Sequence, residues 1–547
     1  MCSSDLLLSR VLASTDPRAR AAACRVVVDW SDRLGRPGVG PDGSPGPLDL
    51  LAPTVDDESM AVRLEGVRAV AAVGLRSPRG SAEARRAAEL ALRAVDRERD
   101  DALDYAVWLA ARELAPAWLP AVLDGTFDDG GRLERVLFAI RAAERVEACG
   151  WLVDRWQRGD VRGTPLDMLV DLIALLGDAR QQRLVLDFVT SPSTPAVRAA
   201  TLLGQQVEAH RRRRVVPEGD LLPVAAMVTS PEPSLAAAAI EAVGTWQVDD
   251  AAPALEALVA DGDQPPERRR GALQSLGRLP GATARDCLAR VAADRDVAEG
   301  SRAGALCALA GSEPAVAAPL AAEWLAGSPS DGAVHEVLRT FLSQRDAAAT
   351  LAAALEDRPI PAAVARAALQ DVTAAGRPEA ELAAVLERAA GGAGSSIDRA
   401  AVLALVRDSA DADRGREIFR RAELRCVACH RIDREGGRVG PNLTAIGAAA
   451  QPDYLLESLL EPARTVKEGY GALVVVTSDG QVTSGIPVSR SDTELVIRDI
   501  LDRDVRLRLD DVEEESPGTS LMPAGLVDAL SPREIADLVR YLSSLGR

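Results

Sequence analysis

The hexapeptide AIEAVG at residues 239–244 carries the pattern that decides the fold: small and aliphatic residues at helical spacing, closed by a glycine. The same ending recurs at Gly204, Gly277, Gly311 and Gly376, so that successive glycines are 40, 33, 34 and 65 residues apart. A stack of helical hairpins needs such a period, because one pair of helices cannot bury its apolar face alone. The pattern predicts that each glycine ends a helix in the left-handed conformation.

The first three quarters of the chain are rich in Ala, Leu, Val and Arg, with few runs typical of strands. We therefore expect a mostly α-helical protein whose first domain, residues 1–408, is a HEAT-like α-solenoid. The stretch 391–396 is rich in glycine and predicts a flexible break. Residues 409–547 differ in character and are expected to form a second domain.

The chain is acidic, with 82 Asp and Glu against 64 Lys and Arg among 547 residues and a net charge of -18. This balance argues against nucleic acid as a partner, because phosphate binding needs a concentrated basic face. No run of apolar residues is long enough for a transmembrane helix. We expect protein–protein contacts through the repeats instead.

The N-terminus does not resemble a native start. Residues 1–6, MCSSDL, lack the basic and apolar parts of a secretion signal. Residues 2–6 also resemble the translation of a common sequencing adapter. These features favour a truncated gene model in which residues 1–6 are not native.

The strongest motif is CVACH at residues 426–430. A C-x-x-C-H pentad is the attachment site of c-type haem, in which Cys426 and Cys429 form thioethers and His430 offers its imidazole to the iron. Structural zinc is the weaker alternative, because no cysteine or histidine follows His430. Thioredoxin-like redox chemistry is also weaker, because a helical pattern and not a strand precedes the cysteines.

Met522 is the only methionine after residue 227. A thioether in the second axial position is typical of a six-coordinate c-type haem, so Met522 is the candidate for that position, with core packing as the alternative. The last helix begins just after it, where Ser531 and Glu534 form a capping-box pattern. We expect this helix to pack against the one that contains Ile418 and Phe419.

A small antiparallel β insertion is predicted at about 472–512, between the middle of this domain and Met522. Its strands are short runs bounded by turn residues, with strict alternation of apolar residues and arginine at 505–509 and with Asp479-Gly480 as a hairpin turn. It is expected to shield the haem or to bind a partner, or else to be a decoration of the fold. The predicted strands are 473–477, 481–488, 494–498 and 505–509.

The segment from about residue 414 to the C-terminus resembles the haem-binding domain of the PVC-type C-x-x-C-H proteins, first grouped from Pirellula and Verrucomicrobium, which often follow HEAT-like repeats. The resemblance implies a class I cytochrome c-like helical domain with one covalently attached haem c. In it, Cys426 and Cys429 hold the haem, while His430 and Met522 coordinate its iron. The carbonyl of Pro441 would accept the other imidazole N–H and fix the ring. The matching stretches are 440–447, 454–462, 469–470, 520–523 and 530–545.

Together these features predict a monohaem c-type cytochrome domain on a helical-repeat scaffold, which transfers single electrons outside the cytoplasm. A periplasmic or exported location follows from the compartment in which c-type haem is attached. We expect no enzyme in this chain, because a His/Met-ligated iron has no open position. Two alternatives remain: the electron-accepting C-terminal part of a sugar or alcohol dehydrogenase whose catalytic propeller is missing, and a repeat-protein interaction scaffold.

The expected partner is a redox protein or a dehydrogenase domain. Residues 420–438 hold six arginines against three acids. Such a basic rim would steer an acidic partner to the haem edge. The competing interpretation is a set of arginines that face water.

Overall fold

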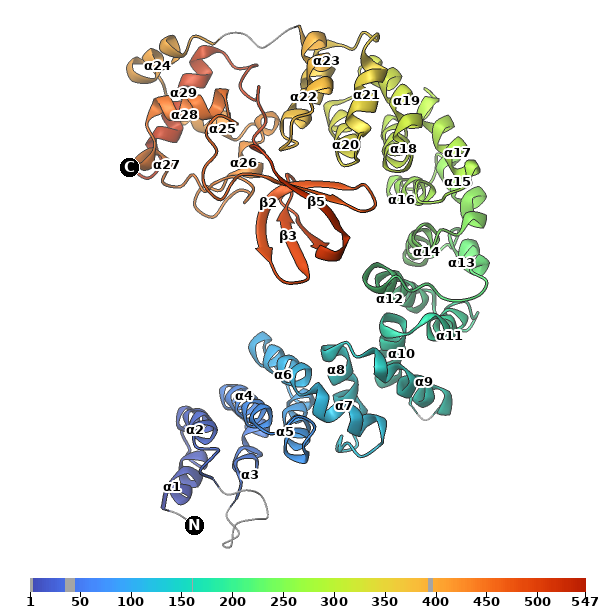
Figure 1. The fold of residues 1–547 in the computed structure, drawn as a ribbon, viewed down its shortest axis with the longest axis vertical. Helices are drawn as coiled ribbons and strands as arrows, with labels where there is room; N and C mark the ends of the chain where they lie inside the picture. Colours follow the sequence, from blue (N-terminus) through green and yellow to red (C-terminus); the bar gives the residue numbers. More distant parts are fainter. Residues whose placement is uncertain (1–2, 35–44, 160, 392–396) are drawn as a thin grey trace. The chain divides into compact units, whose positions relative to one another are not determined.

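The protein, described by a computed structural model, is mostly α-helical and divides into two compact units (Figure 1). The units are Met1–Trp246 and Gln247–Arg547. The structure describes residues 3–34, 45–159, 161–391 and 397–547.

Two predictions fall partly outside the described residues. Residues 1 and 2 of the stretch expected to be non-native are not described, and neither is the predicted flexible break beyond Gly391. The predicted domain boundary between residues 408 and 409 lies within the second compact unit and stays a prediction.

The helices of the first unit are α1 (Ser3–Leu12), α2 (Pro17–Asp29), α3 (Pro47–Leu51), α4 (Met60–Arg76), α5 (Ala82–Arg93), α6 (Asp101–Glu113), α7 (Ala115–Leu123), α8 (Leu133–Ala143), α9 (Cys149–Arg158), α10 (Thr164–Leu176), α11 (Ala179–Val189), α12 (Ala196–Arg213), α13 (Leu222–Met227) and α14 (Pro233–Thr245). Each even-numbered helix from α2 to α14 contacts the next even-numbered one, so these helices form one continuous layer. Local signals start the helices: Asp178 and Gln181 form a capping box at α11.

The second unit continues with α15 (Ala252–Ala260), α16 (Pro266–Leu276), α17 (Ala282–Ala293), α18 (Glu299–Ser312), α19 (Pro314–Ala326), α20 (Asp331–Leu342), α21 (Ala347–Leu355), α22 (Ala362–Thr373), α23 (Ala380–Ala390) and α24 (Arg399–Asp408). The helices α16, α18, α20 and α22 contact one another in turn, and so do the odd-numbered helices from α15 to α23. This two-layered stack confirms the predicted HEAT-like solenoid. Within the described residues, no helix has the length and apolar character needed to cross a bilayer.

The predicted role of the repeated glycines is correct at Gly376 alone, which lies in the left-handed region with a φ of 71°. Gly277 ends α16 with a φ of -64°, which is outside the left-handed region. A Cβ atom on Gly277 would lie 2.8 Å from the Cβ of Ala308 in the next repeat. At this position the glycine provides close contact between helices and not a left-handed cap. The remaining three lie inside helices: Gly204, Gly244 and Gly311.

The C-terminal segment contains α25 (Ala412–Phe419), α26 (Cys426–Cys429), α27 (Ile446–Ala449), α28 (Pro452–Leu460), α29 (Pro532–Ser544), β1 (Leu473–Thr477), β2 (Val482–Arg490), β3 (Glu494–Arg498), β4 (Asp504–Arg508) and β5 (Val512–Pro517). The strands form one antiparallel sheet in the order β4-β3-β2-β1-β5. The four predicted strands correspond to β1 to β4, and Gly480 makes the predicted turn with a φ of 83°. The edge strand β5 was not predicted, because its sequence VEEESP lacks apolar alternation.

The sheet contacts the last repeats of its own unit through main-chain hydrogen bonds. The N–H of Val482 donates to the carbonyl of Ser343 (2.8 Å), and the N–H of Arg345 donates to the carbonyl of Gly480 (3.0 Å). A further bond runs from the N–H of Thr519 to the carbonyl of Gly376 (2.7 Å). The insertion therefore connects the repeats to the C-terminal helices.

Candidate functional site

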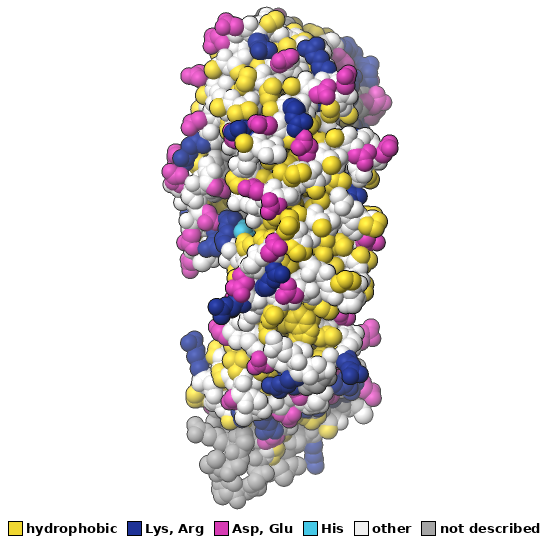
Figure 2. All heavy atoms as spheres, turned by 90° about the vertical axis from the view of Figure 1, so that its right-hand side faces the viewer, with side chains coloured by type: hydrophobic (Ala, Val, Ile, Leu, Met, Phe, Trp, Pro, Cys, Tyr) yellow, Lys and Arg dark blue, Asp and Glu magenta, His cyan; other side chains and the backbone are white. Residues whose placement is uncertain are grey.

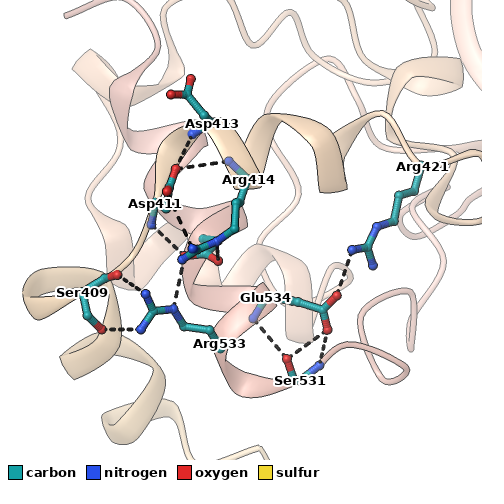
Figure 3. Close-up of polar contacts among 9 residues, drawn as sticks. Ser409, Asp411, Asp413, Arg414, Arg421, Ser531, Arg533 and Glu534 are labelled. Atoms are coloured by element: carbon teal, nitrogen blue, oxygen red, sulfur yellow. Dashed lines mark hydrogen bonds and ion pairs between the residues drawn. The ribbon is translucent and has the colours of Figure 1, made fainter.

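Helices α25 and α29 form the frame of the site (Figure 3). Asp537 of α29, only 2% exposed, accepts hydrogen bonds from the main-chain N–H of Asp411 (2.7 Å) and from Nε of Arg414 (2.9 Å). Burial by itself raises the pKa of Asp537, but these hydrogen bonds outweigh it, so the net shift is downward. Asp537 is therefore ionised at neutral pH and ties the two helices together.

The two helices cross at Gly415. A Cβ atom on this residue would lie 2.0 Å from the carbonyl oxygen of Asp537, so no other residue fits without separating the helices. Beside the crossing, the rings of Phe419 and Tyr541 lie 5.7 Å apart, centroid to centroid. The predicted contact between the first and last helices of this segment is confirmed. The predicted capping box of Ser531 and Glu534 is also present.

The CVACH motif begins as the short helix α26. Cys426 and Cys429 are free thiols in half-buried positions. Burial raises the pKa of both, that of Cys426 to about 11, so both thiols are protonated at neutral pH. Arg425, directly before the motif, has a left-handed φ of 54° and starts the helix at this point.

A glycine-rich loop lies against the backbone of the motif. The N–H of Gly437 donates to the carbonyl of Val427 (2.9 Å), and the N–H of Gly440 donates to the carbonyl of Cys429 (2.8 Å). A Cβ atom on Gly437 would lie 1.9 Å from the carbonyl oxygen of Ala428, so the loop can approach this closely only as glycine. The role of Gly437 was not predicted, although three glycines within residues 436–440 were the available signal.

His430 is held in one orientation. Its Nδ1–H donates to the carbonyl of Pro441 (3.0 Å), the contact that the family resemblance implied. A Cβ atom on Gly440 would lie 2.4 Å from Cε1 of the ring, so this residue also packs against the imidazole. Burial lowers the pKa of His430, and the Pro441 contact only partly opposes this, so the ring is neutral at pH 7. The unprotonated Nε2 therefore has a free lone pair that can ligate a metal ion.

Met522 reaches the same region from a segment that is fixed at both ends. Before it, the N–H of Thr519 donates to the carbonyl of Gly376. After it, the N–H of Ala524 donates to Oγ1 of Thr373 (3.2 Å). The last residue of α22, Thr373, and the loop after it thus hold the segment that carries Met522.

The structure brings the five predicted site residues to the wall of one cavity. This cavity has about 1340 Å³ of space free of protein atoms, counting the part open to solvent. Its wall is mainly apolar and includes Leu455 and Leu459 of α28 and Leu538 and Leu542 of α29. Ile486 of β2 and Ile500 also line it, so the β insertion closes one side. The five predicted residues are Cys426, Cys429, His430, Pro441 and Met522.

The donor set and the cavity fit a covalently attached haem. Two thiols stand one helical turn apart, a neutral imidazole is fixed through Nδ1, a thioether lies in the same cavity wall, and the rest of the wall is apolar. Within the described ranges, no group of three or more His, Cys, Asp or Glu could hold a metal ion. The residues therefore do not fit a zinc site built from protein ligands.

The comparisons with known proteins identify the repeats. A family model described as HEAT repeats matches residues 222–310. None of the curated proteins matches the chain. Among solved structures, the crystal structure of Kap121p bound to Nup53p has a TM-score of 0.41 and 13% identity, covering 71% of this chain and 45% of that one. Importin beta has a TM-score of 0.32 and 12% identity, covering 78% and 67%. The chain thus spans less than half the length of Kap121p.

These findings correct the predicted function. The family match, over residues 222–310, is to HEAT repeats and not to a cytochrome. The prediction of a cytochrome that transfers single electrons is therefore wrong, and the alternative, a repeat-protein interaction scaffold, is the better supported one. The match to HEAT repeats agrees with the expectation that this chain is no enzyme. The haem, its ligands and the compartment are untested and stay predictions.

Proposed function

We propose that the chain is a HEAT-repeat scaffold that binds protein partners. The observation that carries this proposal is the layered packing of successive helices within each unit, together with the match to HEAT repeats over residues 222–310. Each pair of helices in such a stack contacts only its neighbours, so much of every repeat stays available as surface. Figure 2 shows one face of the molecule, on which hydrophobic, acidic and basic side chains are mixed. Such a mixed surface is not the concentrated basic face that phosphate binding needs.

Exposed large hydrophobic side chains favour the first unit as the binding surface. Among the described residues, none is exposed in the repeats from residue 247 to 408, whereas the first unit has several. Repeats that pack only against their neighbours do not need such residues on their surface. The exposed large hydrophobics of the first unit are Leu7, Leu75, Tyr105, Leu123, Val146, Leu184, Val197 and Leu222.

The aromatic ladder on α6, formed by Tyr105, Trp108 and Arg112, is the strongest candidate for a contact point. The rings of Tyr105 and Trp108 stack with centroids 5.8 Å apart, and Cζ of Arg112 lies 5.2 Å from the centroid of the Trp108 ring. Tyr105 is 60% exposed. Tyrosine, tryptophan and arginine are the residues most enriched at energetic hot spots of protein interfaces.

The test is quantitative affinity purification of the full chain and of its Y105S/W108S variant. We expect the variant to retain at most about a tenth of the captured partner. Truncating a hot-spot side chain costs binding free energy, and a loss of about 1.4 kcal/mol weakens the affinity tenfold. The control is L123S, which removes an exposed hydrophobic residue at the end of α7, outside the aromatic ladder. Equal capture by the wild type and Y105S/W108S contradicts the proposed surface.

We also propose that the C-terminal cavity holds one haem c, attached through Cys426 and Cys429 and ligated by His430 and Met522. The apolar wall, the fixed neutral imidazole and the paired thiols support this. Bound haem would supply an iron centre, which the imidazole of His430 and the thioether of Met522 would hold. Because c-type haem is attached outside the cytoplasm, we also propose a periplasmic or exported location for the mature protein.

Mass spectrometry of the full chain, expressed with the haem-attachment machinery, tests the cofactor. We expect the mass of one haem to be added to the wild type and to C287S, which removes a buried thiol of α17. We expect none on C426S/C429S. Wild-type protein without added mass contradicts the proposal. In the absorption spectrum, loss of the methionine-linked near-infrared band in M522A tests the role of Met522.

A further inference from the structure

Helix α6 carries a stripe of side chains in which an acid and a base flank two aromatic rings. Asp101, Tyr105, Trp108 and Arg112 follow one another at intervals of four, three and four residues, so they lie along one side of the helix. Trp108 is half-buried and the other three are exposed. The rings of Tyr105 and Trp108 stack, and the guanidinium of Arg112 lies over the Trp108 ring. The stripe thus has an acidic N-terminal end, an aromatic centre and a basic C-terminal end.

The two charges at the ends of this stripe are not used within the fold. In the part of the chain that the structure describes, neither Asp101 nor Arg112 has an ion pair. Asp104, on the same helix but beside the stripe, is by contrast paired with Arg99 (2.8 Å). The charges at the two ends of the stripe are therefore available to a partner.

The stripe is complementary to a second copy of itself. Its intervals of four, three and four residues read the same from either end, and they are the intervals at which two paired helices meet along a seam. When two α6 helices pack antiparallel about a two-fold axis midway between Tyr105 and Trp108, Asp101 faces Arg112 of the second copy, and Tyr105 faces Trp108 of the second copy. The axis produces each contact twice. The rings then form the centre of the contact and the ion pairs its rim.

The neighbouring helix α8 repeats this order on its own outer side. Glu134, Phe138 and Arg141 are four and three residues apart, again with the acid toward the N-terminus and the base toward the C-terminus. Phe138 is half-buried, and Cζ of Arg99 lies 5.4 Å from the centroid of its ring. Because α6 and α8 contact each other, α8 adds a second row of the same polarity beside the stripe.

We propose that two copies of the chain pair through the α6 stripe in this antiparallel arrangement. The inference rests on the proposed function and names the partner of its aromatic surface, which is a second copy of the chain. Opposite charges face each other at both ends only when the helices are antiparallel, and the helix dipoles favour the same orientation. An interface built on so few helices is small, so the pairing is reversible.

The test is sedimentation equilibrium of the full chain, at concentrations up to about 100 µM because small interfaces are weak. We expect the wild type to dimerise, and D101R and R112D each to weaken dimerisation about tenfold, because each change places like charges opposite one another at two symmetric positions. The double variant D101R/R112D should regain most of the affinity, because opposite charges face each other again. It keeps any local cost of both substitutions to α6, so a folding defect cannot produce this recovery.

The matched control is E113R, which changes the charge by the same amount as D101R. Glu113 is exposed and lies about 100° around the helix from Arg112, outside the stripe, so dimerisation should not change. A wild type that stays monomeric overturns the inference, as does a double variant that dimerises no better than the single ones.

The failure of this inference differs from the failure of the proposed function. A monomeric chain that captures another protein, and loses it in Y105S/W108S, keeps the proposed binding surface and excludes the second copy as its partner. Equal capture by the wild type and Y105S/W108S, with no dimer formed, contradicts both.

Discussion

The repeats from α15 to α23 and the segment from α25 to α29 belong to the same compact unit but use their residues in opposite ways. In the repeats, small and aliphatic side chains fill the space between two regular layers. In the C-terminal segment, short helices cross closely at Gly415 and are tied by the buried carboxylate of Asp537, and an apolar cavity remains between them. The repeats from α15 to α23 therefore use these side chains for packing, whereas the C-terminal segment leaves an interior cavity.

The largest expected effect is that of Gly415→Ala. The added Cβ atom would lie 2.0 Å from a main-chain carbonyl oxygen, which cannot move without separating α25 from α29. We expect a loss of about 3 kcal/mol of stability in the C-terminal segment. Hydrogen–deuterium exchange should show this loss as faster exchange of the amides of α29.

Gly311→Ala in the repeats is the control for this prediction. Gly311 lies inside α18, and a Cβ atom there would meet nothing within 4 Å. Alanine should therefore stabilise the helix by about 0.5–1 kcal/mol. If both substitutions have the same effect, the proposed difference in packing between the two regions is wrong.

The next effect is that of Asp537→Asn. Its buried carboxylate accepts hydrogen bonds from Arg414 and from the N–H of Asp411, so its removal should cost about 2 kcal/mol at pH 7. Asp510→Asn is the control, because the side chain of Asp510 is 86% exposed. The free energy of unfolding of both variants is measured by urea denaturation, with hydrogen–deuterium exchange of the α29 amides as the readout.

The difference in folding stability between the wild type and Asp537→Asn depends on pH, in a direction that the pKa shift of Asp537 determines. Because the folded state lowers the pKa of Asp537, this contribution is fully present above the unfolded value of about 3.9. It is lost as the pH falls through the folded pKa. An advantage that grows on acidification contradicts the assignment of Asp537 as an ionised tie between the helices.

The smallest expected effect is that of Thr373→Val, which tests the link between the two regions. The substitution removes the hydrogen bond from the N–H of Ala524 and should cost about 1 kcal/mol locally. Exchange of the amides around Met522 should become faster. Thr350→Val is matched to it, because the hydroxyl of Thr350 bonds only within its own helix, to the carbonyl of Asp346. Unchanged exchange in Thr373→Val means that the last repeat does not hold the Met522 segment.

Local signals account for what could be predicted from the sequence. The capping box of Ser531 and Glu534, the alternation of apolar and charged residues in β4 and the turn at Gly480 all depend on residues close together in the chain. The strand β5 could not be predicted in the same way, since it pairs with β1 at an exposed edge and needs no apolar side of its own.

Contacts between distant residues account for the rest. The glycine period was correct as a sign of repeats, but its cause at Gly277 is a close approach to Ala308 in the next repeat, which the sequence of one helix does not contain. The hydrogen bond from Val482 to Ser343 joins residues that no sequence pattern connects. In the candidate site, the CVACH motif marked the thiols and His430, whereas the roles of Gly437 and Thr373 needed the three-dimensional arrangement.

The most direct test of the scaffold is hydrogen–deuterium exchange of the full chain, alone and with its captured partner. The proposed function predicts slower exchange on binding in α6, Asp101–Glu113, around the exposed Tyr105 and the half-buried Trp108 that stacks on it. This protection should be absent in Y105S/W108S and unchanged in C426S/C429S. Protection confined to residues 409–547, with α6 unaffected, would contradict a scaffold that binds its partner through the repeats.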